Sequence, residues 1–166
     1  MVTKKYQTAG LILAAAVAAV LLLFVDWEAR AVKKQLRSIA GEMTWSSADS
    51  DLTMASRIRH VQERIAPNCQ VEIPAYEISQ SVDKKDVPAY LMIARKYYKN
   101  ISVKLEDLKV ESIRLPQAKA VTTAYIKATG ADGQRNDEVL MLEFTLQKVE
   151  KKWLITSATE VQVLEK

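Results

Sequence analysis

The sequence predicts an α+β fold: an N-terminal transmembrane helix, then helices packed on a curved antiparallel sheet. Three patterns support this prediction. Residues 6–25 contain no charged residue. Apolar residues then recur at steps of three and four to about residue 98, as on one face of a helix. From Ile101 onward apolar and polar residues alternate, as in strands, and helices before strands favour α+β over alternating α/β.

Length and composition set the outer limits. The chain has 166 residues, which is room for one domain and an appendage. Basic residues exceed acidic ones by 24 to 20, too small an excess to indicate a nucleic-acid binder. Cys69 is the only cysteine and His60 the only histidine, so an internal disulfide and a histidine metal cluster are ruled out. We expect no metal and no cofactor.

The apolar run "YQTAGLILAAAVAAVLLLFV", residues 6–25, is long enough to cross a bilayer as a helix. Trp27 follows it, at the place where indole rings prefer the membrane interface. The alternative is a cleaved signal peptide, with "ARA" at residues 29–31 as the cleavage site. Asp26 and Glu28 crowd that site, and the run is long for a signal, so we favour a retained anchor.

The flanking charges bear on topology. Lys4 and Lys5 favour a cytoplasmic N-terminus, while the basic residues after the run oppose it. We therefore expect a single-pass protein of the inner (cytoplasmic) membrane, with its C-terminal domain exported. The predicted divisions are a short tail at 1–5, a transmembrane helix at 6–25, a juxtamembrane helix at 26–45 and an α+β domain at 46–166.

The juxtamembrane helix has two faces. Its apolar face is a predicted interaction seam, which could pair as a coiled coil or pack on its own domain: Ala29, Val32, Leu36, Ile39 and Met43. Its basic face could contact anionic lipid headgroups, or could simply be solvated: Arg30, Lys33, Lys34 and Arg37.

Two further helices follow. The second shows the apolar positions Leu52, Ala55, Ile58, Val61 and Ile65, and we expect Pro67 to stop it. After a short extended piece at 69–78, a third helix begins near the N-cap Asp86, with Pro88 in its first turn.

Four strands are predicted at 102–115, 120–129, 138–149 and 152–164, close enough together for an antiparallel meander. In the last strand, Trp153, Ile155, Ser157 and Thr159 share one side by simple alternation. The same alternation places Glu143 and Glu160 out of phase with the apolar face.

Three helices, a short strand and a meander ending in "KWLITSATEVQV" resemble the nuclear transport factor 2-like superfamily over roughly residues 46–166. The resemblance implies a cone-shaped domain whose sheet wraps around the helices. Its residues that could line the cone are Tyr97, Tyr125, Leu142, Phe144, Trp153 and Ile155. Catalytic members, which are ketosteroid isomerase-like and dehydratase-like enzymes, place Asp, His or Tyr inside the cone.

The sequence offers poor candidates for such catalysis. Tyr125 and Thr123 could enter the cone, but no acid–base pair is evident beside them. In layout only, the chain also resembles inner-membrane subunits of type IV secretion machines and mammalian-cell-entry-associated membrane proteins. The Asn-Pro-x-Gly motif of the secretion subunits is missing.

These observations leave three hypotheses for function. The first is a non-catalytic, membrane-anchored interaction or scaffold subunit of a cell-envelope assembly, which associates with itself or with other envelope proteins. The second is a domain that binds a small apolar ligand or lipid in the cone. The third is a ketosteroid isomerase-like enzyme.

Overall fold

The computed structural model describes residues 27–161. The apolar run at 6–25, and with it the predicted transmembrane helix, lies outside these residues. Within 27–161, no helix combines the length and the apolar character needed to cross a membrane.

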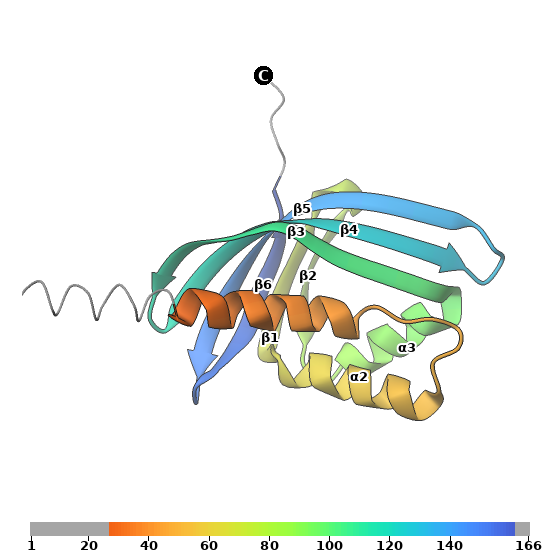
Figure 1. The fold of residues 1–166 in the computed structure, drawn as a ribbon, viewed down its shortest axis with the longest axis horizontal. Helices are drawn as coiled ribbons and strands as arrows, with labels where there is room; N and C mark the ends of the chain where they lie inside the picture. Colours follow the sequence, from red (N-terminus) through yellow and green to blue (C-terminus); the bar gives the residue numbers. More distant parts are fainter. Residues whose placement is uncertain (1–26, 162–166) are drawn as a thin grey trace, which may run out of the picture.

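The described chain forms helices and then, for the most part, strands (Figure 1). An N-terminal helix covers residues 27–42. The elements after it are α2 (Asp51–Glu63), β1 (Ile65–Ile73), a 3-10 turn (Pro74–Tyr76), β2 (Ile78–Asp83), α3 (Val87–Tyr97), β3 (Tyr98–Arg114), β4 (Gln117–Gly130), β5 (Arg135–Val149) and β6 (Lys152–Glu160).

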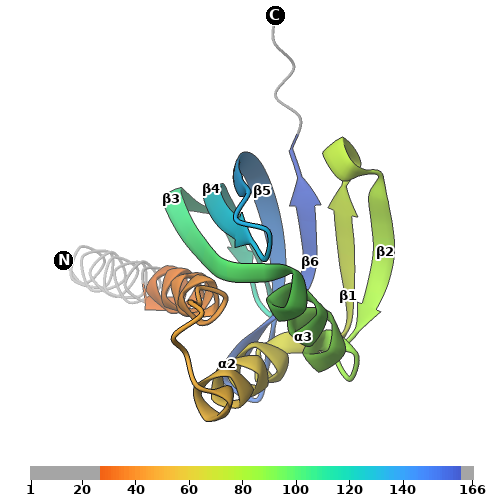
Figure 2. The ribbon, with the colours of Figure 1, turned by 90° about the vertical axis from the view of Figure 1, so that its right-hand side faces the viewer.

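The strands form one six-stranded sheet in the order β2-β1-β6-β5-β4-β3, which Figure 2 shows from one end. The α+β class is confirmed, but the sheet is mixed rather than antiparallel, because β1 runs parallel to β6. β1 and β2 also form an antiparallel hairpin where the sequence predicted only one short extended piece. The parallel pair joins residues almost ninety positions apart, so local spacing could not predict it.

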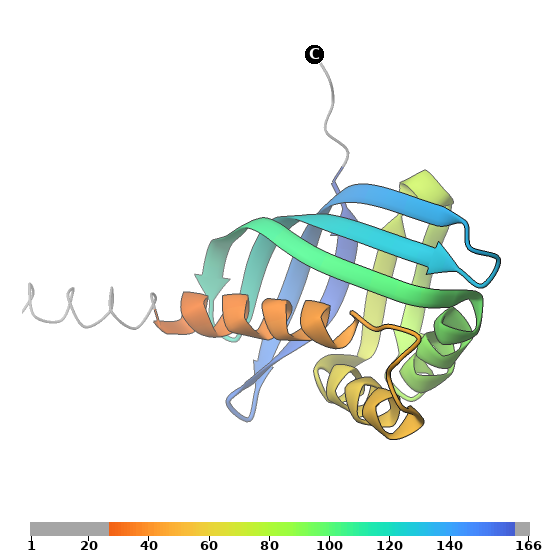
Figure 3. The same cartoon turned by 45° about the vertical axis from the view of Figure 1, so that its right-hand side comes forward.

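The helices pack on the inner face of the curved sheet, with the N-terminal helix beneath β3 and β4 and with α2 and α3 at one end (Figure 3). Val32 and Leu36 of the N-terminal helix are fully buried in a core with Leu146, Trp153 and Ile155. The predicted interaction seam therefore packs on its own sheet, and its prediction as a coiled-coil surface is wrong for Val32, Leu36 and Ile39. The helix predicted as a separate juxtamembrane segment completes the core of the domain.

A second, smaller core lies between α2 and α3. It contains Trp45, Met54, Ile58, Val61, Val87 and Leu91. Ser50 caps α2 by accepting a hydrogen bond from the Thr53 backbone N–H. Two details of the sequence prediction for α2 are wrong: Leu52 is 82% exposed, and the helix ends at Glu63, so Pro67 lies in β1 and does not stop it.

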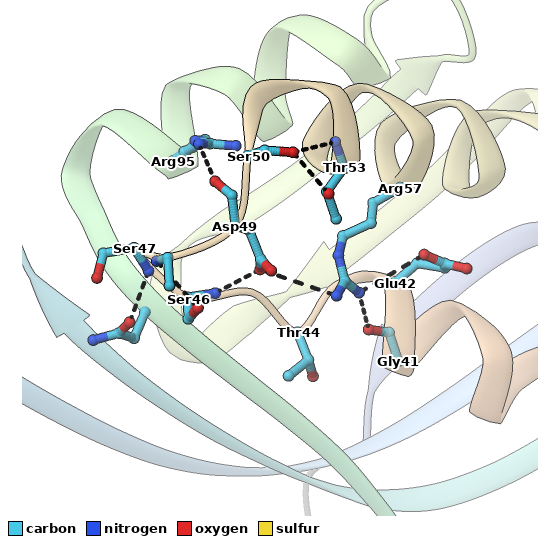
Figure 4. Close-up of polar contacts among 12 residues, drawn as sticks. Gly41, Glu42, Thr44, Ser46, Ser47, Asp49, Ser50, Thr53, Arg57 and Arg95 are labelled. Atoms are coloured by element: carbon cyan, nitrogen blue, oxygen red, sulfur yellow. Dashed lines mark hydrogen bonds and ion pairs between the residues drawn. The ribbon is translucent and has the colours of Figure 1, made fainter.

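A polar network joins the end of the N-terminal helix to α2 (Figure 4). The Arg57 guanidinium donates to the Gly41 carbonyl at 3.1 Å and lies 3.8 Å from the Glu42 carboxylate. It also lies 4.0 Å from Asp49, whose carboxylate accepts from the Ser46 backbone N–H at 2.9 Å. These bonds fix the loop between the two helices, so the N-terminal helix is held at its C-terminal end as well as along its apolar face.

Candidate functional site

The interior of the cone contains several of the residues predicted to line it. Trp153 and Ile155 are buried together with Leu146, and Phe144 packs against the same core. Leu142 is half-buried and lies outside both cores. The N-terminal helix fills this part of the interior, so these side chains contact protein atoms.

Two predicted cone-lining residues lie elsewhere. Tyr97 is 64% exposed at the end of α3. Tyr125 pairs with Val139 across β4 and β5, on the face opposite to the buried Ala124, and is 37% exposed. Thr123 shares that outer face. Both tyrosines are corrections to the prediction, because strand phase directs Tyr125 outward and the end of α3 lies outside the sheet.

An irregularity in the β5–β6 pairing corrects a third prediction. Leu146 faces Ile155 whereas Thr145 faces Ser157, so one extra residue, Thr156, is inserted into β6. Beyond this bulge the faces exchange, and Glu160 pairs with Leu142 rather than lying out of phase with it. Glu143 keeps its predicted outer position, where its carboxylate accepts from Lys119 at 3.0 Å.

Among residues 27–161, one carboxylate is buried in the interior, and the sequence analysis did not identify it as a site. Glu28, at the start of the described helix, is 2% exposed. Its Oε2 accepts a 2.9 Å hydrogen bond from Trp153 Nε1, and its Oε1 accepts one from Lys148 Nζ. The Lys148 ammonium also lies 5.8 Å from the centre of the Trp153 ring, within cation–π range.

The Glu28 cluster, which consists of Glu28, Lys148 and Trp153, leaves no carboxylate oxygen free for a substrate. A general base needs a carboxylate oxygen within reach of its substrate, and both oxygens of Glu28 already accept hydrogen bonds from the protein. Its geometry therefore ties the helix to the β5–β6 hairpin. The spacing Glu28–Val32–Leu36 could have revealed this position, because steps of four place all three residues on one helix face.

A groove lies on the other side of Trp153, outside the cone. It has a volume of about 350 Å³ and lies between the N-terminal helix, the junction of α2 with β1, and the β5–β6 turn. We call it the basic groove. Its lining is Ala31, Lys34, Gln35, Ser38, Glu63, Arg64, Lys151, Lys152, Trp153 and Leu154.

The predicted lipid-contact residues lie on the helix face beside this groove. Arg30, Lys34 and Arg37 are exposed and Lys33 is half-buried. Only Lys34 of the four lines the groove.

Two other features are relevant to function. Exposed apolar side chains gather on the outer sheet face at Tyr125, Val139, Met141 and Val161.

Cys69 is buried in the larger core, and burial raises the pKa of its thiol to about 11. Among residues 27–161, no group of three or more His, Cys, Asp or Glu side chains is placed to hold a metal ion.

Comparison with known proteins identifies the fold. No protein-family model matches this sequence, and no curated protein matches it. Solved structures do match, and several of them are described as enzymes; one is described as a member of the nuclear transport factor 2-like family. The predicted cone fold is thereby confirmed for the described domain.

Three of these structures illustrate how varied the described functions of the matching proteins are. A candidate dehydratase of the nuclear transport factor 2-like family from Streptomyces avermitilis has a TM-score of 0.63 and 13% identity, over 82% of this chain and 97% of that one. A candidate aromatic ring hydroxylase from Novosphingobium aromaticivorans has a TM-score of 0.65 and 14% identity, over 81% and 88%. A candidate calcium/calmodulin-dependent protein kinase II association domain from Xanthomonas campestris has a TM-score of 0.52 and 14% identity, over 74% and 94%. At these identities the likeness establishes the fold alone, because one fold supports many functions.

Proposed function

We propose that this chain is a non-catalytic interaction domain, anchored at the inner membrane by residues 6–25, that associates with itself or with other envelope proteins. The observation that carries the proposal is the packed interior around the N-terminal helix. Val32 and Leu36 have essentially no exposed surface, and Trp153 is 4% exposed. The burial of these side chains supports a domain whose contacts are made on its outer surface.

The outer face of the sheet carries exposed apolar side chains that could contact another protein. The patch of Tyr125, Val139, Met141 and Val161 lies on one face of neighbouring strands, and Val139 is 59% exposed. Large exposed apolar side chains that cluster in this way are typical of protein contact surfaces. We expect the patch to be the contact with a second copy, because self-association through one patch closes by two-fold symmetry.

The proposal is tested by extracting the full chain in mild detergent, purifying it by an affinity tag, and measuring its mass and its companions. A dimer, or a stoichiometric complex with other envelope proteins, supports an interaction domain. Val139→Lys should break a self-contact, whereas Val149→Lys is the matched control, since Val149 is also exposed on β5 but lies outside the patch. A monomer that co-purifies with nothing would contradict the proposal.

The second candidate is an enzyme of the dehydratase or isomerase kind, and the descriptions of the structural neighbours favour it over a scaffold. In such an enzyme, Glu28 and Lys148 would be the only ionisable pair at the interior core available for proton transfer among the described residues. The substrate would have to displace Lys148 or Trp153 from the carboxylate.

The enzyme candidate is tested by screening the purified chain for dehydration or isomerisation of small cyclic alcohols and ketones. Any activity found should be abolished in Glu28→Gln, which keeps the size of the side chain and removes its basicity. Activity that survives this change would exclude Glu28 as the base. A small apolar ligand in the cone, the remaining hypothesis, would require the N-terminal helix to move off the sheet.

A further inference from the structure

The basic groove is formed by three separate parts of the chain that the fold brings together. Figures 1 and 3 show the β5–β6 hairpin projecting past the N-terminal helix. Lys151 and Lys152 lie at the tip of this hairpin, Lys34 lies on the helix, and Arg64 caps the C-terminal end of α2. Four cationic side chains therefore line one groove, although Lys34 precedes Lys151 and Lys152 by more than a hundred residues.

The acidic residue in the groove's lining is already paired. Glu63 lies 3.0 Å from the Arg59 guanidinium in an exposed ion pair one helical turn apart. This hydrogen bond holds the pKa of Glu63 below its usual range. Lys148, the nearby lysine of β5, is likewise taken up by Glu28. Glu63 also attracts Lys152, but four cationic side chains against one lining carboxylate leave the groove with an excess of positive charge.

The backbone of Arg64 is held in place by a hydrogen bond, but one nitrogen of its guanidinium lacks a hydrogen-bond acceptor among the described residues. Its carbonyl accepts a 3.0 Å hydrogen bond from the Ile155 backbone N–H, which fixes the residue against β6. Its Nη1 is buried and has no hydrogen-bond partner among the described residues. A buried guanidinium nitrogen without a partner is costly. Arg64 also lines the groove, so an oxyanion bound there would supply the missing acceptor once the guanidinium turns toward it.

The walls beside Arg64 are also fixed. Gln35 Nε2 donates a 2.9 Å hydrogen bond to the Trp153 carbonyl, so the N-terminal helix and β6 are clamped together across the groove. Ser38 adds a hydroxyl to the lining. The volume of about 350 Å³ falls at the lower end of the range of roughly 300–1,000 Å³ that small-molecule sites occupy.

We propose that the basic groove binds a phosphate group, either of an anionic phospholipid headgroup or of a soluble phosphate ester. The guanidinium fork matches phosphate geometry, and clustered ammonium groups neutralise its charge. A phosphate monoester, with a charge of about −1.5 to −2 at pH 7, compensates more of the groove's positive charge than a carboxylate or a phosphodiester headgroup, each of which carries a single negative charge. The inference does not depend on the proposed scaffold function, because the groove lies outside the cone and away from the outer sheet patch.

The test is calorimetric titration of the full chain in a neutral detergent at low ionic strength. Four probes separate the sources: inorganic phosphate, dihexanoyl phosphatidylglycerol, dihexanoyl phosphatidylcholine as the zwitterionic control, and acetate. Binding of inorganic phosphate indicates a soluble phosphate site. Binding of phosphatidylglycerol without inorganic phosphate indicates a headgroup site. Either result supports the proposal, and affinity should fall as NaCl is added.

Variants connect the binding to the groove. Arg64→Gln should lower the affinity for the phosphate probe by about tenfold or more, because a hydrogen bond between charged groups is lost. The double variant Lys151→Gln/Lys152→Gln should lower this affinity by a similar factor. It should not lower the melting temperature, since both side chains are exposed. Lys104→Gln is the matched control, an exposed lysine on β3 outside the groove.

Three results would overturn the proposal. The first is an absence of binding by both phosphate probes. The second is equal affinity for phosphatidylcholine, which would show that net negative charge is not recognised, or for acetate, which would show that phosphate is not distinguished from a carboxylate. The third is an unchanged affinity in Arg64→Gln and in the double lysine variant, or an equal loss in Lys104→Gln. The purification experiment that tests the scaffold function would be unaffected by any of them.

Discussion

Two charged regions lie against Trp153 and differ in how their charges are satisfied. On the inner side, the Glu28 carboxylate is buried and receives one hydrogen bond on each oxygen, from Trp153 and from Lys148. On the outer side, four cations line a groove, and one of them, Arg64, has a buried Nη1 with no hydrogen-bond partner among residues 27–161. The comparison teaches that a fully paired buried charge is costly to break, whereas charge left in excess at a groove supports the proposal of a ligand there.

The largest expected effect comes from Trp153, which belongs to both regions. Trp153→Ala should lower the free energy of unfolding by roughly 3–5 kcal/mol, because a large cavity opens beside Val32 and Leu36. Denaturant unfolding of the full chain in mild detergent, followed by near-ultraviolet circular dichroism, measures this loss. Trp153→Phe is the control: it keeps most of the volume and should cost about 1–3 kcal/mol for the donor that Glu28 loses. A loss below about 1 kcal/mol in Trp153→Ala would instead indicate an open pocket and favour the apolar-ligand hypothesis.

Breaking the inner pair should have the next largest effect. Lys148→Met leaves the buried Glu28 carboxylate without its cation and should cost about 3 kcal/mol, at the lower end for a buried pair because Lys148 is partly exposed. Adding Glu28→Gln to Lys148→Met should recover much of that loss, so the double-mutant cycle should show coupling. The matched control is Lys119→Met, which breaks the solvent-exposed pair with Glu143 and should cost no more than about 1 kcal/mol. Equal losses in the two lysine variants would show that burial does not set the strength of the inner pair.

Cys69 offers a smaller test of the same principle, because its thiol is buried without a charged partner. Burial raises its pKa from 9.0 to about 11, so the folded protein holds the neutral thiol more strongly than the unfolded chain does. This contribution to stability should be fully present below pH 9 and should be lost as the pH rises toward 11. Modification by a thiol reagent at pH 8 should be slow in the native protein and fast in denaturant. Rapid native modification would show that the larger core opens readily at β1.

The sequence predicted the elements better than their pairing. Alternation from Ile101 onward located the four strands that became β3 to β6, and the turn signals around Asp86 located α3, because both patterns are local. The β1–β2 hairpin was missed, since Pro67 and Pro74 break up a segment with no clean alternation. The bulge at Thr156 was missed too, and it exchanged the faces of Ser157 and Glu160. A bulge depends on how two strands align, which neither strand's sequence specifies alone.

The candidate site shows the same limit. Val32, Leu36 and Ile39 were identified as one apolar stripe, but the stripe alone does not say whether it packs on its own sheet or on another chain. Glu28 was interpreted as an acidic residue at the exit of a membrane segment, although it extends the same stripe. Its partners Lys148 and Trp153 are more than a hundred residues away, so only folding reveals that it is paired.

The sequence by itself determined the α+β class, the helical stripes, the strand alternation and the apolar run at 6–25, because each follows from a short-range period in hydrophobicity. The tertiary structure decided the parallel joining of β1 to β6, the burial of Glu28, the outward position of Tyr125 and the meeting of four cations around the groove beside Trp153. These properties depend on which distant segments come into contact. That choice is made by the joint burial of apolar faces and the pairing of backbone groups across the whole chain.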